Sequence, residues 1–217
     1  MDLWGETVLR QIEEVSIDLS GSYRGLVKKL MPQARIVADR FHVMQQVSQE
    51  LNMTRYQEIK ALAKDANDPE RDRIKTVLKS SKYALLKPEA SLTEKQRVTL
   101  ERVKQISPKL AQMHQQKEDL RVIFETATDR DDGVNQMVGW LIAAQDTFIN
   151  STVTLTNWFD ETVNYFVHRT SSGQVEGINN KLKLIKRSGY GFRNFANFEL
   201  RCLICWHLDF SPAYFRR

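Results

Sequence analysis

The first forty residues alternate between short β-branched runs and one stretch with helical spacing. Residues 15–19 form a short β-branched run that ends at the turn residues Ser20, Gly21 and Ser22. Apolar side chains then recur at helical spacing over residues 23–30, and residues 34–39 form a second β-branched run. A strand, a helix and a strand within about 25 residues make a compact βαβ unit, so we expect two parallel, adjacent strands.

Residues 41–166 have helical spacing almost throughout, and residues 6–13 predict a further short helix. The expected breaks fall where Pro, Gly, Asp, Asn and Ser gather, at residues 67–69, 87–88, 107–108 and 131–133. Ser91 and Glu94 have the spacing of a capping box, and Pro108 suits the first turn of a helix. The pattern therefore predicts a mostly helical α/β protein in three parts: an α/β piece over 1–42, a helical block over 43–166, and a C-terminal part over 167–217.

The C-terminal part opens with a basic amphipathic helix. At about 100° per residue its apolar stripe consists of Val175, Ile178, Leu182 and Ile185. The opposite side carries Glu176, Asn180, Lys183 and Arg187. A single carboxylate on a basic face suits a group that holds a divalent metal against a phosphate backbone. A first-turn Glu that the helix dipole stabilises would give the same pattern. From this segment alone, we favour that ordinary interpretation.

The amino-acid composition narrows the class of protein without identifying it. The chain has 217 residues, 41% of them hydrophobic and 27% charged, as in ordinary globular proteins. A net charge of +5 permits a nucleic-acid partner without requiring one. There is no apolar run of membrane-spanning length, and the acidic, mixed start does not resemble a signal peptide. Cys202 and Cys205 are too few for a disulfide framework, so we expect a reducing, cytoplasmic setting and buried thiols rather than a zinc site.

Two acids end the two predicted strands. Asp18 and Asp39 each lie at the carboxyl end of a strand, where parallel α/β sheets place their sites. Adjacent strands are about 4.8 Å apart, and two carboxylates so close repel unless a cation or a proton neutralises them. Mg²⁺ and Mn²⁺ prefer such oxygen ligands. The alternative is that each Asp only caps the helix after its strand. His42 would orient Asp39, contact a phosphate, or serve as an ordinary structural residue.

The segment after residue 180 is rich in cations and aromatics. No acid interrupts its basic residues, which are Lys181, Lys183, Lys186, Arg187 and Arg193. Uncompensated charge of this kind is what phosphate neutralisation requires. Tyr190, Phe192 and Phe195 have the chemistry to stack on unpaired bases, but Phe192, Phe195 and Phe198 also have core spacing. We expect the cations to contact DNA and the aromatics to pack in a core.

Four motifs, taken in order, resemble the DDE transposases of bacterial insertion sequences, in particular the ISL-three group. They are VSIDLSGSY at 15–23, PQA followed by IVADRFHV within 32–43, VEGINNK at 175–181 and GYGFRNF at 189–195. Residues 83–87, 92–94 and 117–121 resemble the helical insertion of that family. The resemblance spans nearly the whole chain.

The resemblance implies a ribonuclease-H-like core interrupted by a helical insertion. Such enzymes use two divalent metals, Mg²⁺ or Mn²⁺, to activate the attacking water or 3′-hydroxyl and to stabilise the leaving oxygen. By position, Asp18 matches the second acid and Glu176 the third, while Asp39 and His42 match a neighbouring Asp-x-x-His element. Tyr23 and the five cations would contact DNA at the transposon ends and target, and the complete enzyme would act as a homo-oligomer.

The chain also departs from the family pattern. The first acid is expected on an earlier strand well upstream, yet only 17 residues precede Asp18, and Ser172 stands where Asn is expected. The zinc-binding and helix-turn-helix region that recognises DNA has no counterpart. We therefore expect a C-terminal transposase fragment with an exposed sheet edge, impaired on its own. The alternatives are a non-catalytic DNA-binding or multimerisation fragment, and a structural helical protein with no nucleic-acid role.

Overall fold

The computed structural model describes residues 5–62, 69–171 and 173–207, with residues 174–176 and 207 described by their backbone alone. The chain divides into two compact units, Met1–Ser171 and Ser172–Arg217. Each unit is considered by itself. The part of the expected C-terminal tail beyond residue 207 lies outside the described residues.

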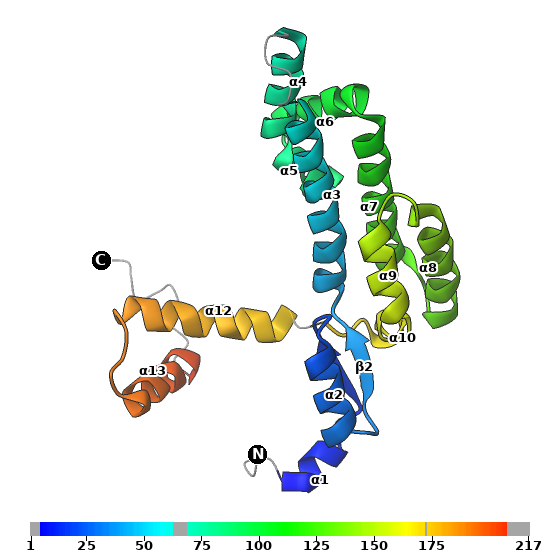
Figure 1. The fold of residues 1–217 in the computed structure, drawn as a ribbon. Helices are drawn as coiled ribbons and strands as arrows, with labels where there is room; N and C mark the ends of the chain where they lie inside the picture. Colours follow the sequence, from blue (N-terminus) through cyan, green and yellow to red (C-terminus); the bar gives the residue numbers. More distant parts are fainter. Residues whose placement is uncertain (1–4, 63–68, 172, 208–217) are drawn as a thin grey trace. The chain divides into compact units, whose positions relative to one another are not determined.

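The first unit begins with the predicted βαβ arrangement (Figure 1). Its elements are α1 (Gly5–Arg10), β1 (Glu14–Ile17), α2 (Gly21–Leu30) and β2 (Arg35–Ala38). The strands pair in parallel, with a register that runs from Glu14 opposite Arg35 to Ile17 opposite Ala38. The prediction of two adjacent parallel strands is confirmed, and among the described residues they form a two-stranded sheet.

The sheet joins the helical block through β2 and the helix that follows it. Val37 and Ala38 are fully buried, whereas β1 is half-buried along its length. Helix α3 (Arg40–Leu62) begins two residues after the strand ends, and its buried side chains Val43, Val47 and Leu51 recur every four residues. One apolar core therefore runs from the sheet into the helices.

The helical block confirms the expectation of a mostly helical protein. It comprises α4 (Pro69–Ser80), α5 (Lys82–Leu86), η2 (Glu89–Ser91), α6 (Glu94–Ile106), α7 (Pro108–Thr126), α8 (Arg130–Ala144), α9 (Ile149–Asn157), α10 (Phe159–Val163) and α11 (Tyr165–His168). Helix α7 packs between α3 and α8, and α10 returns to β2. No helix of the described residues is long and apolar enough to cross a membrane.

One predicted helix start in the block differs from the structure, and another agrees with it. Thr93 and Gln96 form the capping box of α6, so the prediction from Ser91 and Glu94 is wrong, because Ser91 ends the preceding 3₁₀ turn. Pro108 is the first residue of α7, as predicted, with the Ser107 hydroxyl accepting from the Leu110 amide at 3.1 Å.

The break expected at residues 131–133 is wrong. Asp129 caps α8 by accepting from the amides of Asp131 and Asp132, at 2.9 and 3.0 Å, so both acids lie in the first helical turn. Gly133 lies within the helix, facing the ring of Phe166. Its role is to admit an aromatic ring against the helix, and not to form a turn.

Polar side chains tie the α/β piece to the helices. The Asn164 amide donates to the carbonyl of Ile36 on β2 at 2.9 Å. Arg24 on α2 forms a 2.7 Å ion pair with the buried Glu161 on α10. Glu50 on α3 accepts from the amides of Asn150 and Ser151, at 3.0 and 2.7 Å, and so caps α9. The first two contacts hold β2 and α2 against the region of α10, and the third joins α3 to α9.

The second unit is a helical hairpin of α12 (Gly173–Ser188) and α13 (Phe195–His207). Ile185 and Cys202 are its buried side chains among the described residues, while Cys205 is half-buried. Leu200, Leu203 and Ile204 on α13 remain exposed. The hairpin thus has a small core and an uncovered apolar face.

Candidate metal and nucleic-acid site

The two strand-end acids occupy adjacent positions at one edge of the sheet. Asp18 directly follows β1 and Asp39 directly follows β2. The strand register pairs Ile17 with Ala38, and the Asp39 amide donates to the Ile17 carbonyl at 2.8 Å. Continued by one residue, this register sets Asp18 beside Asp39 at the carboxyl edge of the sheet.

The environments of these two acids differ. Asp39 is 2% exposed, and its Oδ1 accepts from the Phe41 amide at 2.7 Å, so it caps the start of α3. Asp18 is half-buried, and its Oδ1 is enclosed without a hydrogen-bond partner among the described residues. The capping alternative therefore holds for the side chain of Asp39. Asp18 retains a buried acceptor that suits a cation or a donor.

A polar face of β1 was missed in the sequence. Glu14, Ser16 and Asp18 alternate along the strand and so share one face. Each has a buried side-chain oxygen without a hydrogen-bond partner in the described part of the chain. Arg35 lies 3.6 Å from Glu14, an ion pair too long for a hydrogen bond. The period-two polar pattern at 14, 16 and 18 was the available signal.

The donor set fits a divalent cation in part. Asp18 and Asp39 provide carboxylate oxygens, the ligands that Mg²⁺ and Mn²⁺ prefer. No group of three or more His, Cys, Asp or Glu side chains in the described residues forms a metal site. Glu176 lies in the first turn of α12, but its side chain is outside the described part. His42 is half-buried, with its ring edge-to-face on Phe41 at 5.3 Å.

The predicted DNA contacts lie on both units. Tyr23 is exposed on α2 in the first unit. The five predicted cations are all exposed on α12 or in the turn after it; they are Lys181, Lys183, Lys186, Arg187 and Arg193. The described residues form no ion pair with any of them, although Lys181 lies 4.3 Å above the Trp206 ring. Their charge is available to an external anion.

The aromatic residues near these cations divide into two kinds. Phe192 packs on Phe198, with ring centroids 5.3 Å apart, as a core prediction requires. Phe195 is 75% exposed and Tyr190 is fully exposed. The core prediction is therefore wrong for these two side chains, because a two-helix hairpin covers only the ring that folds back over its turn.

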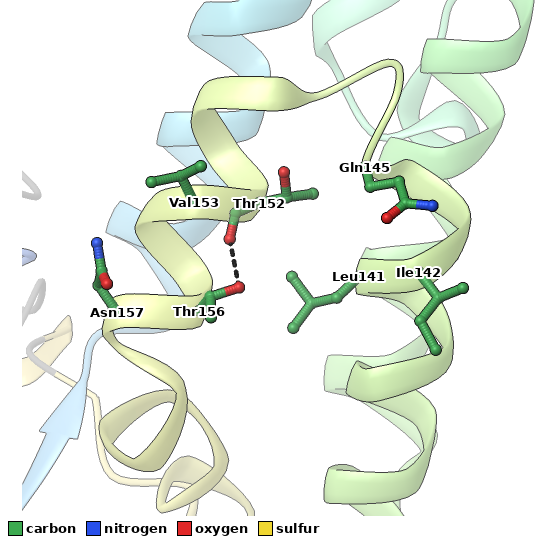
Figure 2. Close-up of a pocket in the computed structure, with 7 residues that line it drawn as sticks. All are labelled: Leu141, Ile142, Gln145, Thr152, Val153, Thr156 and Asn157. Atoms are coloured by element: carbon green, nitrogen blue, oxygen red, sulfur yellow. Dashed lines mark hydrogen bonds between the residues drawn. The ribbon is translucent and has the colours of Figure 1, made fainter.

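A surface pocket of about 350 Å³ lies between α8 and α9, away from these residues in sequence (Figure 2). Leu141, Ile142 and Val153 supply its apolar wall, and the Thr156 hydroxyl donates to the Thr152 carbonyl at 2.8 Å. None of its lining side chains is ionisable. It offers no charged side chain for a metal ion or a phosphate.

Parallel strands that each end in an acid, with a separate basic helix, agree with the class of protein that the sequence motifs resemble, the transposases. Residues 1–202 match the model of a protein family described as Transposase. The chain belongs to this family, the DDE transposases of the ISL3, or ISL-three, group.

Curated relatives agree with this assignment. The chain is 26% identical over 205 residues to the transposase for insertion sequence element IS1001 of Bordetella parapertussis, a match covering 88% of this chain and 47% of the relative. It is 27% identical over 213 residues to the transposase for insertion sequence element IS1557 of Mycobacterium tuberculosis, covering 89% and 47%. The chain thus spans about half the length of these relatives. No solved structure matches it significantly.

Proposed function

We propose that this chain is the C-terminal portion of a DDE transposase catalytic domain, which cleaves and joins DNA strands at insertion-sequence ends. The observation that supports it most is the position of Asp18 next to Asp39, one residue beyond the paired strands, where Asp18 has a buried oxygen without a hydrogen-bond partner among the described residues. The βαβ unit would be part of a ribonuclease-H-like sheet, and α3–α11 the helical insertion.

Each acid has its own role in this proposal. Asp18 and Glu176 would hold Mg²⁺ or Mn²⁺, which activates the attacking oxygen and stabilises the leaving one. Asp39 would be a positioning residue, because its carboxylate fixes the start of α3 beside Asp18. His42, in the first turn of α3, would support the same strand end.

The basic residues of α12 would hold the DNA backbone. If all five contact phosphates of duplex DNA, the logarithm of the binding constant falls with the logarithm of salt concentration with a slope of about −4.5. Tyr23 would add a contact from the first unit, next to Arg24, which the ion pair with Glu161 holds in place.

Alone, the 217-residue chain would be impaired in cleavage. The resemblance places the family's first acid on a strand well before Asp18, and the sheet of the described residues has two strands, β1 and β2. The complete enzyme would supply that acid and a strand partner for β1, and would act as a homo-oligomer.

Metal binding and strand cleavage test the proposal together. Mn²⁺ should raise the unfolding free energy of the chain by about 1.4 kcal/mol at ten times its dissociation constant. Asp18→Asn should abolish that rise, whereas Asp146→Asn, at an exposed turn position, should leave it unchanged. An equal Mn²⁺ effect in both variants would refute the role of Asp18. Full Mg²⁺-dependent cleavage of labelled insertion-end DNA by the chain alone would contradict the impairment.

The second candidate is a non-catalytic DNA-binding or multimerisation fragment. It is favoured by the exposed apolar side chains of α13, Leu200, Leu203 and Ile204, which offer a surface to another chain. DNA binding that survives Glu176→Gln, with no cleavage by the parent chain, would support it. DNA affinity that does not weaken as salt rises would exclude the proposed phosphate contacts in both candidates and would leave only multimerisation.

A further inference from the structure

Helix α12 ends in a turn that normally requires glycine. The Gly191 amide donates to the Lys186 carbonyl at 3.1 Å, and the Tyr190 amide donates to the Arg187 carbonyl at 3.0 Å. These two bonds define a Schellman motif, in which the residue at the position of Tyr190 adopts the left-handed conformation. Tyr190 has φ of 51° there, where a β-carbon crowds the backbone.

Arg169 is the other non-glycine residue with positive φ among the described residues, and hydrogen bonds hold its side chain in place. Arg169 has φ of 55°, and its guanidinium donates to the carbonyls of Phe124 and Ala127, at 2.9 and 2.5 Å. Among the described residues Tyr190 makes no comparable contact, and its side chain is fully exposed. The strained backbone at Tyr190 thus presents a ring to the surroundings.

The turn is packed without the help of Tyr190. The ring of Phe192 lies over Gly189, so close that a β-carbon there would approach it to 2.6 Å. Phe192 also packs on Phe198, and the Arg201 guanidinium lies 5.8 Å from its ring centroid. These contacts fold the turn back on α13 and hold the position from which Tyr190 projects.

Cations surround this position in the sequence and share its exposure. Lys186, Arg187 and Arg193 lie within four residues of Tyr190, and the described residues form no ion pair with them. An exposed ring on a rigid turn among uncompensated cations is the combination that binds single-stranded DNA, since the ring stacks on a base while the cations contact phosphates.

We propose that Tyr190 stacks on an unpaired base of single-stranded DNA whose neighbouring phosphates contact Lys186, Arg187 and Arg193. The inference rests on the proposed function in taking DNA as the ligand. It goes further in assigning a base contact to one residue and a preference for unpaired over duplex DNA to the turn.

The test compares variants of the full 217-residue chain by fluorescence anisotropy with a labelled oligothymidylate of about 12 nucleotides. Tyr190→Gly removes the ring and relieves the left-handed backbone, so loss of folding cannot explain its effect. We expect about tenfold or greater weakening for the single strand, and an unchanged slope against salt, because the phosphate contacts remain. Tyr190→Phe should bind within about twofold of the parent, since stacking needs the ring alone.

Tyr83 provides the matched control. It is an exposed tyrosine on α5, with the ammonium groups of Lys82 and Lys87 within 5.6 and 5.9 Å of its ring centroid, but its backbone is helical. Tyr83→Ala should leave the affinity unchanged. Equal loss in both variants would overturn the assignment of stacking to Tyr190.

Other results separate this inference from the proposed function. If Tyr190→Gly binds the single strand like the parent while Arg193→Gln reduces the salt slope, the inference is wrong, and the proposed phosphate contacts of the basic residues stand. If the parent binds no DNA, both are wrong. If Tyr190→Gly changes the sedimentation behaviour but not the DNA affinity, the ring belongs to a protein interface and the inference is overturned.

Discussion

Two glycines of one helix should respond in opposite ways to the same substitution. Both Gly133 and Gly139 lie in α8, and the first is buried whereas the second is exposed. A β-carbon on Gly133 would approach Cδ2 of Phe166 to 2.2 Å, while one on Gly139 would meet no atom within 4 Å. Gly133→Ala should therefore destabilise the first unit, and Gly139→Ala should stabilise it.

The magnitudes follow from these contacts. Replacing helical Gly by Ala gains up to about 1 kcal/mol from backbone entropy, which is the whole effect at Gly139. At Gly133 the ring must move, and it is held by Phe124, stacked at 5.5 Å, and by Tyr165 at 5.7 Å. Overpacking of this kind costs about 1–3 kcal/mol, and a contact this short to a fixed ring lies at the upper end. After the gain in backbone entropy is subtracted, Gly133→Ala should lose about 1–2 kcal/mol.

Urea unfolding followed by far-ultraviolet circular dichroism measures the difference. We expect midpoints on opposite sides of the parent, a gap of about 2–3 kcal/mol, and an unchanged m-value. In thermal unfolding this corresponds to about 4–12 °C between the variants. In the Phe166→Leu background the cost of Gly133→Ala should shrink, because a smaller side chain leaves room for the methyl group.

The reasoning fails if both alanine variants shift the midpoint equally and in the same direction. That result would mean that the ring of Phe166 yields to the methyl group without cost. A cost at Gly133 that persists in full in the Phe166→Leu background would show that the strain lies elsewhere than in this contact.

Two further predictions concern polar side chains of the first unit. Glu50→Gln should lose about 1–2 kcal/mol by urea unfolding, because an amide cannot replace both carboxylate oxygens that accept from Asn150 and Ser151; no loss would refute Glu50 as the cap of α9. Burial, followed by the charge of Lys117, lowers the pKa of His114 from 6.5 to about 4. The unfolded chain therefore binds this proton first, so stability should fall as the pH drops from 6.5 to about 4, by up to about 3 kcal/mol. His114→Leu should flatten this dependence in unfolding measured across that range, and an undiminished slope would contradict it.

Local patterns in the sequence predicted the elements that bear the strand-end acids. The β-branched runs and the helical spacing between them predicted β1, α2 and β2, because side-chain period follows directly from backbone geometry. Parallel pairing then followed from the length and handedness of the connection, and it set Asp18 beside Asp39. Pro108 marked the start of α7 because its ring fits only the first helical turn.

Other features depend on partners far away in the chain. The Asp-Asp-Gly string at 131–133 has the composition of a turn, and only the ring of Phe166 explains a glycine inside the helix. Lys117 looks like a surface residue in the sequence, yet it is fully buried. Its ammonium donates to the carbonyls of Leu85 and Lys87, at 2.7 and 3.0 Å, and burial lowers its pKa.

The sequence by itself determined the mostly helical α/β class, the placement of Asp18 and Asp39 after parallel strands, and the basic face of α12, because each depends on residues close together in the chain. Tertiary structure decided that Asp39 caps α3, while Asp18 has a buried oxygen without a hydrogen-bond partner in the described part of the chain. It also decided that Phe192 packs while Tyr190 projects from a strained turn. Burial and hydrogen bonding depend on contacts between segments that are far apart in the sequence. Composition and residue spacing do not reveal those contacts.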